Sequence, residues 1–172
     1  MDGRLAILFG VMSLFGDEYQ VEGINIDRGD IAGHIVTSAG FTQQNGINGS
    51  FEYRLSYALP QKWGRFNPML DISTTDAGSF WVGFGLYQQF DIEMGDSDLF
   101  AGFYFSPGLY YKGDDVDLGF PLEFRSGIEF GVKLDNDWQV SISYDHRSNA
   151  DVVAFNPGIE TIQLRISKPF GR

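Results

Sequence analysis

Apolar and polar residues alternate with a period of two over most of the chain from residue 48 onward. Successive side chains of a β-strand point to opposite faces, so this period predicts strands that have one apolar face and one polar face. Clusters of Gly, Asn, Asp and Pro separate the alternating segments and are typical of turns. In the segment SFEYRLSYAL, for example, Phe51, Tyr53, Leu55 and Tyr57 alternate with Glu52, Arg54 and Ser56.

The alternating segments predict eight antiparallel strands. A water-soluble sandwich would bury the apolar faces, whereas an outer-membrane barrel would turn them toward lipid. Many Phe residues on one face, with Gly and Tyr on the other, fit a narrow lumen filled by side chains. We therefore favour an all-β fold, an eight-stranded antiparallel up-and-down transmembrane β-barrel of the outer-membrane type. The expected strands span about 31–42, 48–58, 65–74, 79–91, 98–111, 119–134, 137–148 and 158–169, with NGINGS as the first turn.

Charged residues fall on the polar faces of these strands, where we expect them to pair inside the lumen. These charged residues are Glu52, Arg54, Glu123, Arg125, Glu129, Asp145, Arg147 and Arg165. The histidine His34 is expected to have a structural role.

The first 30 residues are expected to form a separate segment ahead of a barrel domain at 31–172. The stretch LAILFGVMSLFG is apolar like a secretory signal, but MDGR before it has no net positive charge and no A-x-A site follows. We favour a signal-like or accessory segment. The alternative is that this stretch is the first strand and that residues 16–47 form a long outer loop.

The amino-acid composition excludes several classes of function. Twelve Lys and Arg against 23 Asp and Glu give a net charge of −11, and the absence of a basic stripe argues against a nucleic-acid partner. With no Cys and two His, thiol chemistry and His-rich metal clusters are excluded. The acidic GDDVD at 113–117 lacks the ligand spacing of a calcium loop. We expect no cofactor and no metal.

The stretch SYDHRSNADVVAFNPGIETI places His146 and Ser148 two residues apart on the outward face, and a hairpin brings Glu160 opposite them. Polar groups on a lipid-facing surface are costly without partners, which favours a functional role. A hydroxyl nucleophile, an imidazole base and an orienting carboxylate form a hydrolytic triad. Since H-x-S alone is a weak motif, the competing interpretation is that these residues mark the lipid–water boundary. Tyr144, one same-face step from His146, is a candidate wall for an acyl-chain groove.

The segments LGFPLEFRSGIEFGVKL, YDHRSNA and NPGIE resemble the carboxy-terminal half of the lipid A 3-O-deacylases, the PagL-like family of the Gram-negative outer membrane. The family pattern is similar to H-x-S-N-A followed by N-x-G-I-E, and the steps from His146 to Ser148 and to Glu160 agree with it. Asp151 departs from the pattern, which often has Gly there.

The resemblance implies an outer-membrane serine esterase that hydrolyses the 3-O-linked acyl chain of lipid A without a cofactor. It makes Ser148 the nucleophile, His146 the base and Glu160 the orienting acid, and it makes Asn149 and Asn156 candidates for stabilising the oxyanion. Lipopolysaccharide and outer-membrane lipids would be the partners, and a homodimer is left open. The alternative function is a non-enzymatic structural or adhesion barrel.

Overall fold

The computed structural model describes residues 18–21, 24–95 and 97–170, and this part of the chain is almost entirely β-structure. A short 3-10 helix, Asp135–Asp137, interrupts the strands. No helix in the described part has the length and apolar character needed to cross a membrane. The strands are β1 (Glu18–Val21), β2 (Ile24–Arg28), β3 (His34–Gln44), β4 (Ile47–Ala58), β5 (Asn67–Thr75), β6 (Phe80–Met94), β7 (Ser97–Tyr111), β8 (Leu122–Lys133), β9 (Gln139–Ser148) and β10 (Ile159–Pro169).

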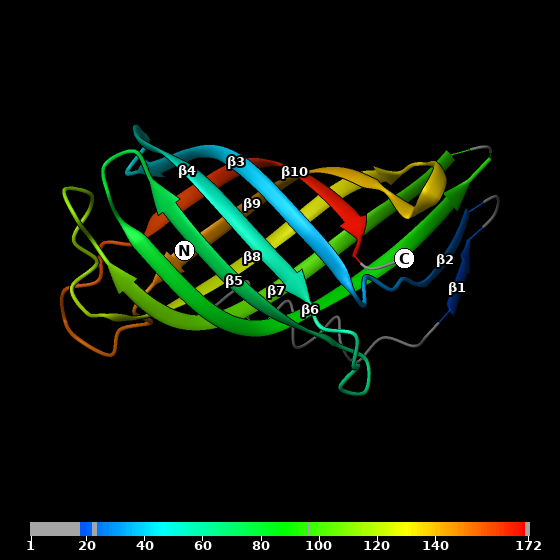
Figure 1. Cartoon of the computed structure of the whole chain (residues 1–172), viewed down its shortest axis with the longest axis horizontal. Helices are drawn as coiled ribbons and strands as arrows, with labels where there is room; N and C mark the ends of the chain where they lie inside the picture. Colours follow the sequence, from blue (N-terminus) through cyan, green and yellow to red (C-terminus); the bar gives the residue numbers. More distant parts are fainter. Residues whose placement is uncertain (1–17, 22–23, 96, 171–172) are drawn as a thin grey trace.

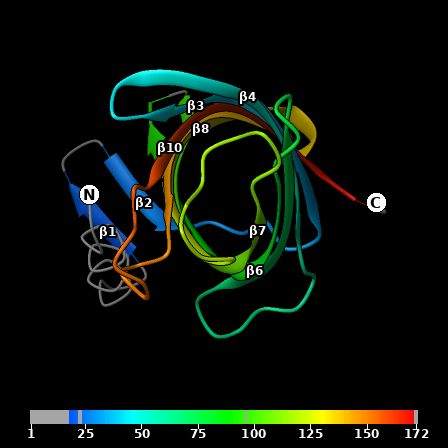
Figure 2. The ribbon, with the colours of Figure 1, turned by 90° about the vertical axis from the view of Figure 1, so that its left-hand side faces the viewer.

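Strands β3 to β10 form a closed antiparallel barrel in which each strand pairs with its neighbours in sequence. Pairing of β10 with β3 closes the ring, which is visible when the molecule is viewed from its end (Figure 2). The eight-stranded up-and-down barrel predicted from the alternation is confirmed.

The start of the barrel differs from the prediction in detail. The first turn is Asn45–Gly46, whose φ angles of 50° and 78° fit a two-residue hairpin turn, so the residues from Ile47 onward already belong to β4. The prediction of NGINGS as the turn is therefore wrong, because Asn-Gly alone supplies both positive φ angles. The alternative in which residues 16–47 form one outer loop is also wrong, since β3 is part of the barrel wall.

A hairpin of β1 and β2 lies outside the ring (Figures 1 and 2). Strand β2 pairs with Phe90–Met94 of β6. Strand β6 extends past the end of its pairing with β5, and β2 covers the edge left free there. The signal-like stretch predicted near the N-terminus falls within residues 1–17 and lies outside the described residues.

The two ends of the barrel differ in their loops. The two longest connections at one end, residues 112–121 and 149–158, lie together at the left of Figure 1. The C-terminal end of β10, the short connections between β6 and β7 and between β8 and β9, and the β4–β5 connection of residues 59–66 lie at the other end. Outer-membrane barrels have short periplasmic turns and longer extracellular loops, so the end with the long β7–β8 and β9–β10 loops faces the outside of the cell.

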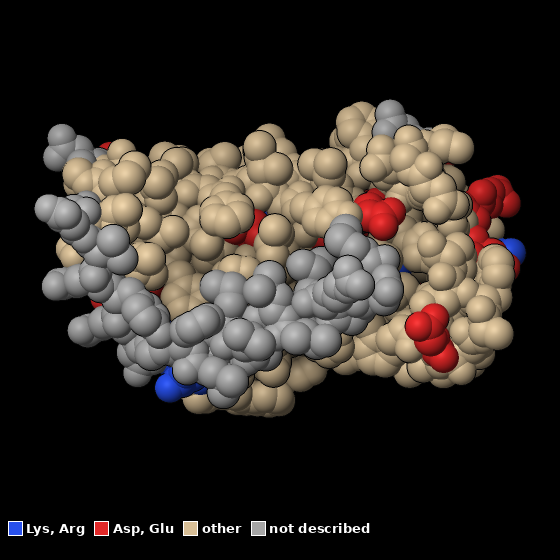
Figure 3. Space-filling model, turned by 180° about the vertical axis from the view of Figure 1, so that it is seen from behind, with Lys and Arg blue, Asp and Glu red and all other residues tan. Residues whose placement is uncertain are grey.

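The outward faces of the strands are apolar and exposed, as a lipid-facing wall requires. Ile142 is 63% exposed and Phe130 is 60% exposed. Charged side chains are sparse across the middle of the face in Figure 3, and the acidic ones are more frequent toward the long-loop end.

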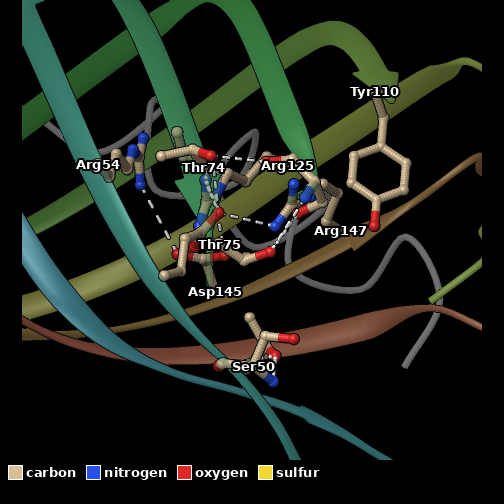
Figure 4. A network of polar contacts seen from close by, with 12 residues as sticks. Ser50, Arg54, Thr74, Thr75, Tyr110, Arg125, Asp145 and Arg147 are labelled. Atoms are coloured by element: carbon tan, nitrogen blue, oxygen red, sulfur yellow. Dashed lines mark hydrogen bonds and ion pairs between the residues drawn. The ribbon is translucent and has the colours of Figure 1, made fainter. Parts of the chain in front are cut away.

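The lumen is filled by buried charged side chains, as predicted. Glu52 accepts hydrogen bonds from Arg125 and Arg147, and Arg125 also contacts Asp145 at 2.8 Å. The network around Arg54, Arg125, Arg147 and Asp145 is shown in Figure 4. Glu123 is an exception to the predicted pairing, because neither of its carboxylate oxygens has a hydrogen-bond partner among the described residues although the side chain is buried.

Candidate active site

Strand β9 carries His146 and Ser148 on its outward face. It pairs with both β8 and β10 without a register shift, so the alternation of side chains continues to the end of the strand. His146 and Ser148 therefore share a face with the exposed Ile142. Between them, Arg147 points into the lumen, where it donates a hydrogen bond to Glu52 Oε1 at 2.9 Å.

Glu160 lies directly opposite His146 in the pairing of β10 with β9. The distance from His146 Nδ1 to Glu160 Oε1 is 3.4 Å, and the two side chains are 11% and 25% exposed. This is longer than a close hydrogen bond but keeps the carboxylate next to the ring. With Nδ1 turned toward Glu160, the second ring nitrogen, Nε2, remains available to exchange a proton with another group.

Ser148 lies one same-face step beyond His146, at the extracellular end of β9, and is 9% exposed. Its Oγ accepts a hydrogen bond of 3.4 Å from the backbone N–H of Ala150. No hydrogen bond among the described residues joins Ser148 to the His146 ring. The structure thus brings Glu160 to His146 and leaves Ser148 and His146 as neighbours without a direct hydrogen bond.

Gly158 packs against the imidazole and was not predicted as a site residue. Its φ is +68°, and a Cβ added there would lie 2.7 Å from His146 Cε1. Any side chain at this position would therefore displace the ring. The sequence signals for this position were the turn-like Pro157-Gly158 pair immediately before β10 and the glycine of the N-x-G-I-E pattern.

Asn149 and Asn156 hold the β9–β10 loop. Asn149 Nδ2 donates to the backbone oxygens of Leu118 and Phe155 at 2.8 and 2.9 Å, which uses both of its hydrogens. Asn149 N donates to Asn156 Oδ1 at 3.0 Å, and Asn156 Nδ2 donates to Asp151 at 2.9 Å. In this structure both asparagines therefore shape the loop beside Ser148.

A model of the lipid A 3-O-deacylase family, PagL, matches residues 45–169, which include the three polar residues just described. The chain belongs to the lipid A 3-O-deacylase family. Membership makes it a lipid A deacylase of the Gram-negative outer membrane. The alternative of a non-enzymatic barrel does not agree with this match.

Solved structures agree with the fold. The crystal structure of the outer membrane enzyme PagL is 23% identical, with a TM-score of 0.65 over 80% of this chain and 99% of that one. Neisserial surface protein A is 12% identical, with a TM-score of 0.50 over 86% of this chain and 97% of that one. No curated protein sequence matches the chain.

The wall of the deacylase next to the site is apolar. Tyr144, half-buried, pairs in register with Ile162 on one side and with Ile128 on the other. Phe124 lies opposite Ser148 and stacks on Phe105, with ring centroids 6.0 Å apart and planes 15° apart. Aromatic and aliphatic side chains therefore lie next to Ser148 on the outward face.

The backbone conformation at Asp151 is one that suits Gly, the residue that the family pattern often has at this position. Its φ is +61°, a left-handed conformation that Gly adopts freely and that Asp tolerates better than most residues. The departure from the family pattern therefore leaves the turn after Ala150 intact, and the carboxylate of Asp151 accepts the hydrogen bond from Asn156.

The acidic β7–β8 loop of the deacylase makes its contacts within the protein. Asp115 accepts a hydrogen bond from Thr75 at 2.8 Å, and Asp117 pairs with Lys112 at 2.9 Å. The hydrogen bond from Lys112 and that from the Gly119 N–H hold the pKa of the Asp117 carboxyl below its ordinary value. Across the described residues there is no group of three or more His, Cys, Asp and Glu placed to hold a metal ion.

Proposed function

We propose that the chain removes the 3-O-linked acyl chain of lipid A with Ser148 as nucleophile, His146 as general base and Glu160 as the carboxylate that orients the imidazole. The observation that supports this most directly is the contact of His146 with Glu160 on the outward face, one same-face step from Ser148. The three residues lie at the extracellular end of β9 and β10, at the level of the outer leaflet, where lipid A resides.

The chemistry follows that of a serine esterase. His146 takes the proton of Ser148 as Oγ attacks the ester carbonyl, and Glu160 stabilises the imidazolium that forms. Collapse of the tetrahedral intermediate breaks the ester C–O bond, and His146 returns the proton to the 3-oxygen of the departing sugar. Water, activated by His146, then hydrolyses the acyl-enzyme and releases the fatty acid. No step needs a metal or a cofactor.

Asn149 and Asn156 are the residues proposed to stabilise the oxyanion of the tetrahedral intermediate. Of the two, Asn156 is better placed to supply a side-chain donor, because its hydrogen bond to Asp151 is exposed and is exchanged more easily than the buried bond from Asn149 to Leu118. A donor aimed at the developing negative charge lowers the barrier to attack.

Access to substrate is proposed to be lateral, from the membrane. Ile142, Ile162 and Leu164 are exposed on the same wall as the triad. Tyr144 lies between Ile142 and His146 on β9, directly opposite Ile162. The acyl chain would lie along this wall, and membrane lipids would surround the rest of the barrel.

A homodimer would place a second copy elsewhere on the wall, and sedimentation of the protein in detergent would reveal it.

Mass spectrometry of lipid A from cells that express the chain tests the proposal. We expect the loss of one acyl group with the native chain, and a rate lower by several orders of magnitude for Ser148→Ala and for His146→Ala. Glu160→Ala should cost less, since an orienting carboxylate is partly replaceable. Ser143→Ala is the matched control, because Ser143 is on the same strand but is buried in the lumen. Near-normal deacylation by Ser148→Ala at confirmed surface expression would rule out Ser148 as the nucleophile.

A further inference from the structure

A row of polar side chains crosses the outer face of the barrel at the level of His146. Gln43 of β3 pairs with Glu160 of β10, Glu160 pairs with His146 of β9, and His146 pairs with Ser126 of β8. Directly paired residues on neighbouring antiparallel strands point to the same face. Ser126 is therefore the neighbour of His146 on the side opposite Glu160.

Apart from His146, the outward-facing neighbours of Ser126 on β7 and β8 are apolar. Its hydroxyl has no hydrogen-bond partner among the described residues, although the residue is only partly exposed. Phe105 is its direct partner on β7, and Phe124 and Ile128 flank it on β8. Within the described segments 99–109 of β7 and 122–132 of β8, it is the one polar residue on the outward face. The other outward residues there are Leu99, Ala101, Phe103, Phe105, Pro107, Leu109, Leu122, Phe124, Ile128, Phe130 and Val132.

We propose that the Ser126 hydroxyl binds a hydroxyl group carried by the scissile acyl chain close to its ester carbonyl, and that Ser126 is thereby a specificity residue. This inference rests on the proposed function of Ser148. Ser126 is the diagonal neighbour of Ser148, because Phe124 is the residue directly opposite Ser148. Such diagonal neighbours are roughly 7–8 Å apart between Cα atoms.

The position of Ser126 relative to Ser148 along the barrel wall also agrees with this role. Ser148 is at the extracellular end of β9, so the row that holds His146 and Ser126 lies one same-face step deeper in the membrane. An acyl chain whose carbonyl is at Ser148 and whose tail enters the membrane brings its first carbons past this row. A hydroxyl on these carbons meets Ser126, whereas the later carbons meet Ile128 and Phe130.

The environment makes the hydrogen bond selective. An unsubstituted chain would cover Ser126 with hydrocarbon and leave its hydroxyl without a partner, which is unfavourable. A hydroxylated chain pairs both hydroxyl groups as water is excluded. Polar sites in enzymes discriminate in this way against substrates that lack the matching group.

The test uses the full chain purified in detergent and two glucosamine 3-O-esters of equal chain length, one with a hydroxyl at the third carbon of the acyl chain and one without. We expect the native chain to prefer the hydroxylated ester in kcat/KM. Ser126→Ala should lower the ratio of the two kcat/KM values about tenfold, the factor that corresponds to a hydrogen bond of about 1.4 kcal/mol. Ser126→Thr keeps a hydroxyl and should keep much of the preference.

Thr37→Val is the matched control, since Thr37 is a lipid-facing hydroxyl on β3, remote from the row, and its loss should leave the ratio unchanged. An unchanged ratio in Ser126→Ala would overturn the inference. Equal losses on both esters would also overturn it, because Ser126 would then act through His146. If the native chain hydrolysed neither ester, the proposed function itself would fail.

Discussion

Gly158 controls how closely the backbone approaches the imidazole of His146. The residue is the last before β10, its φ is positive, and the space that a side chain would occupy is filled by the ring. Gln44 Nε2 donates to the Gly158 carbonyl at 3.4 Å and ties this backbone to β3. The glycine thus positions the His146 ring, the proposed base, although it has no functional group of its own.

Gly158→Ala should lower kcat/KM for lipid A about a hundredfold, since small displacements of a catalytic group have effects of this size. The added Cβ would push the ring away from Glu160, and the expected signature is lost activity in a folded barrel, checked by the heat-dependent shift in gel mobility. Gly78→Ala is the control, because Gly78 has a φ of +78° but no atom within 4 Å of the added Cβ. Full activity of Gly158→Ala would show that the ring is not fixed by this contact.

At the scale of elements, the β7–β8 loop supports the β9–β10 loop that follows Ser148. Leu118 is 1% exposed and packs with Trp81, Tyr110 and Ile159 at the extracellular end of the lumen. Its backbone oxygen accepts the hydrogen bond from Asn149. The position of the loop beside Ser148 therefore depends on a side chain that does not touch the site.

Leu118→Ala should loosen both loops by leaving a cavity where the leucine packs. We expect kcat/KM to fall about tenfold and limited proteolysis within residues 112–121 to become faster, because local opening costs less than global unfolding. The urea midpoint of the barrel should change little. Val152→Ala, an exposed change in the β9–β10 loop, should alter neither readout. Unchanged proteolysis together with unchanged activity would contradict the coupling of the loops.

For the molecule as a whole, Glu52 connects the strands through the lumen. Its carboxylate accepts hydrogen bonds from Arg125 and Arg147, from Gln163 and from Ser73, which belong to β8, β9, β10 and β5. Arg147 lies between His146 and Ser148 in sequence, so this network also fixes β9 from the inside.

Glu52→Gln should lower the free energy of unfolding by about 3–5 kcal/mol, because the buried guanidinium groups of Arg125 and Arg147 both lose the charge of Glu52, and Arg125 keeps only its ion pair with Asp145. Urea unfolding in detergent micelles, followed by tryptophan fluorescence, measures the change. Glu93→Gln, at an exposed position near the end of β6, should change stability by less than about 0.5 kcal/mol. Equal stability of Glu52→Gln and the native chain would mean that the remaining lumen contacts compensate for the lost charge.

Much of this fold could be predicted because the alternation of side chains is a local property. The outward apolar residues, the inward charges around Glu52 and the shared face of His146 and Ser148 all follow from a period of two. The β1–β2 hairpin could not be predicted in the same way, since its pairing depends on how far β6 extends past β5.

The sequence by itself determined the number of barrel strands, which residues face lipid, and the presence of His146, Ser148 and Glu160 on one surface. Only the tertiary structure decided which residues meet across strands: Ser126 beside His146, Gly158 against its ring, and Leu118 beneath Asn149. The physical reason is that side-chain direction is set within each strand, whereas cross-strand neighbours depend on the register at which distant segments pair when the barrel closes.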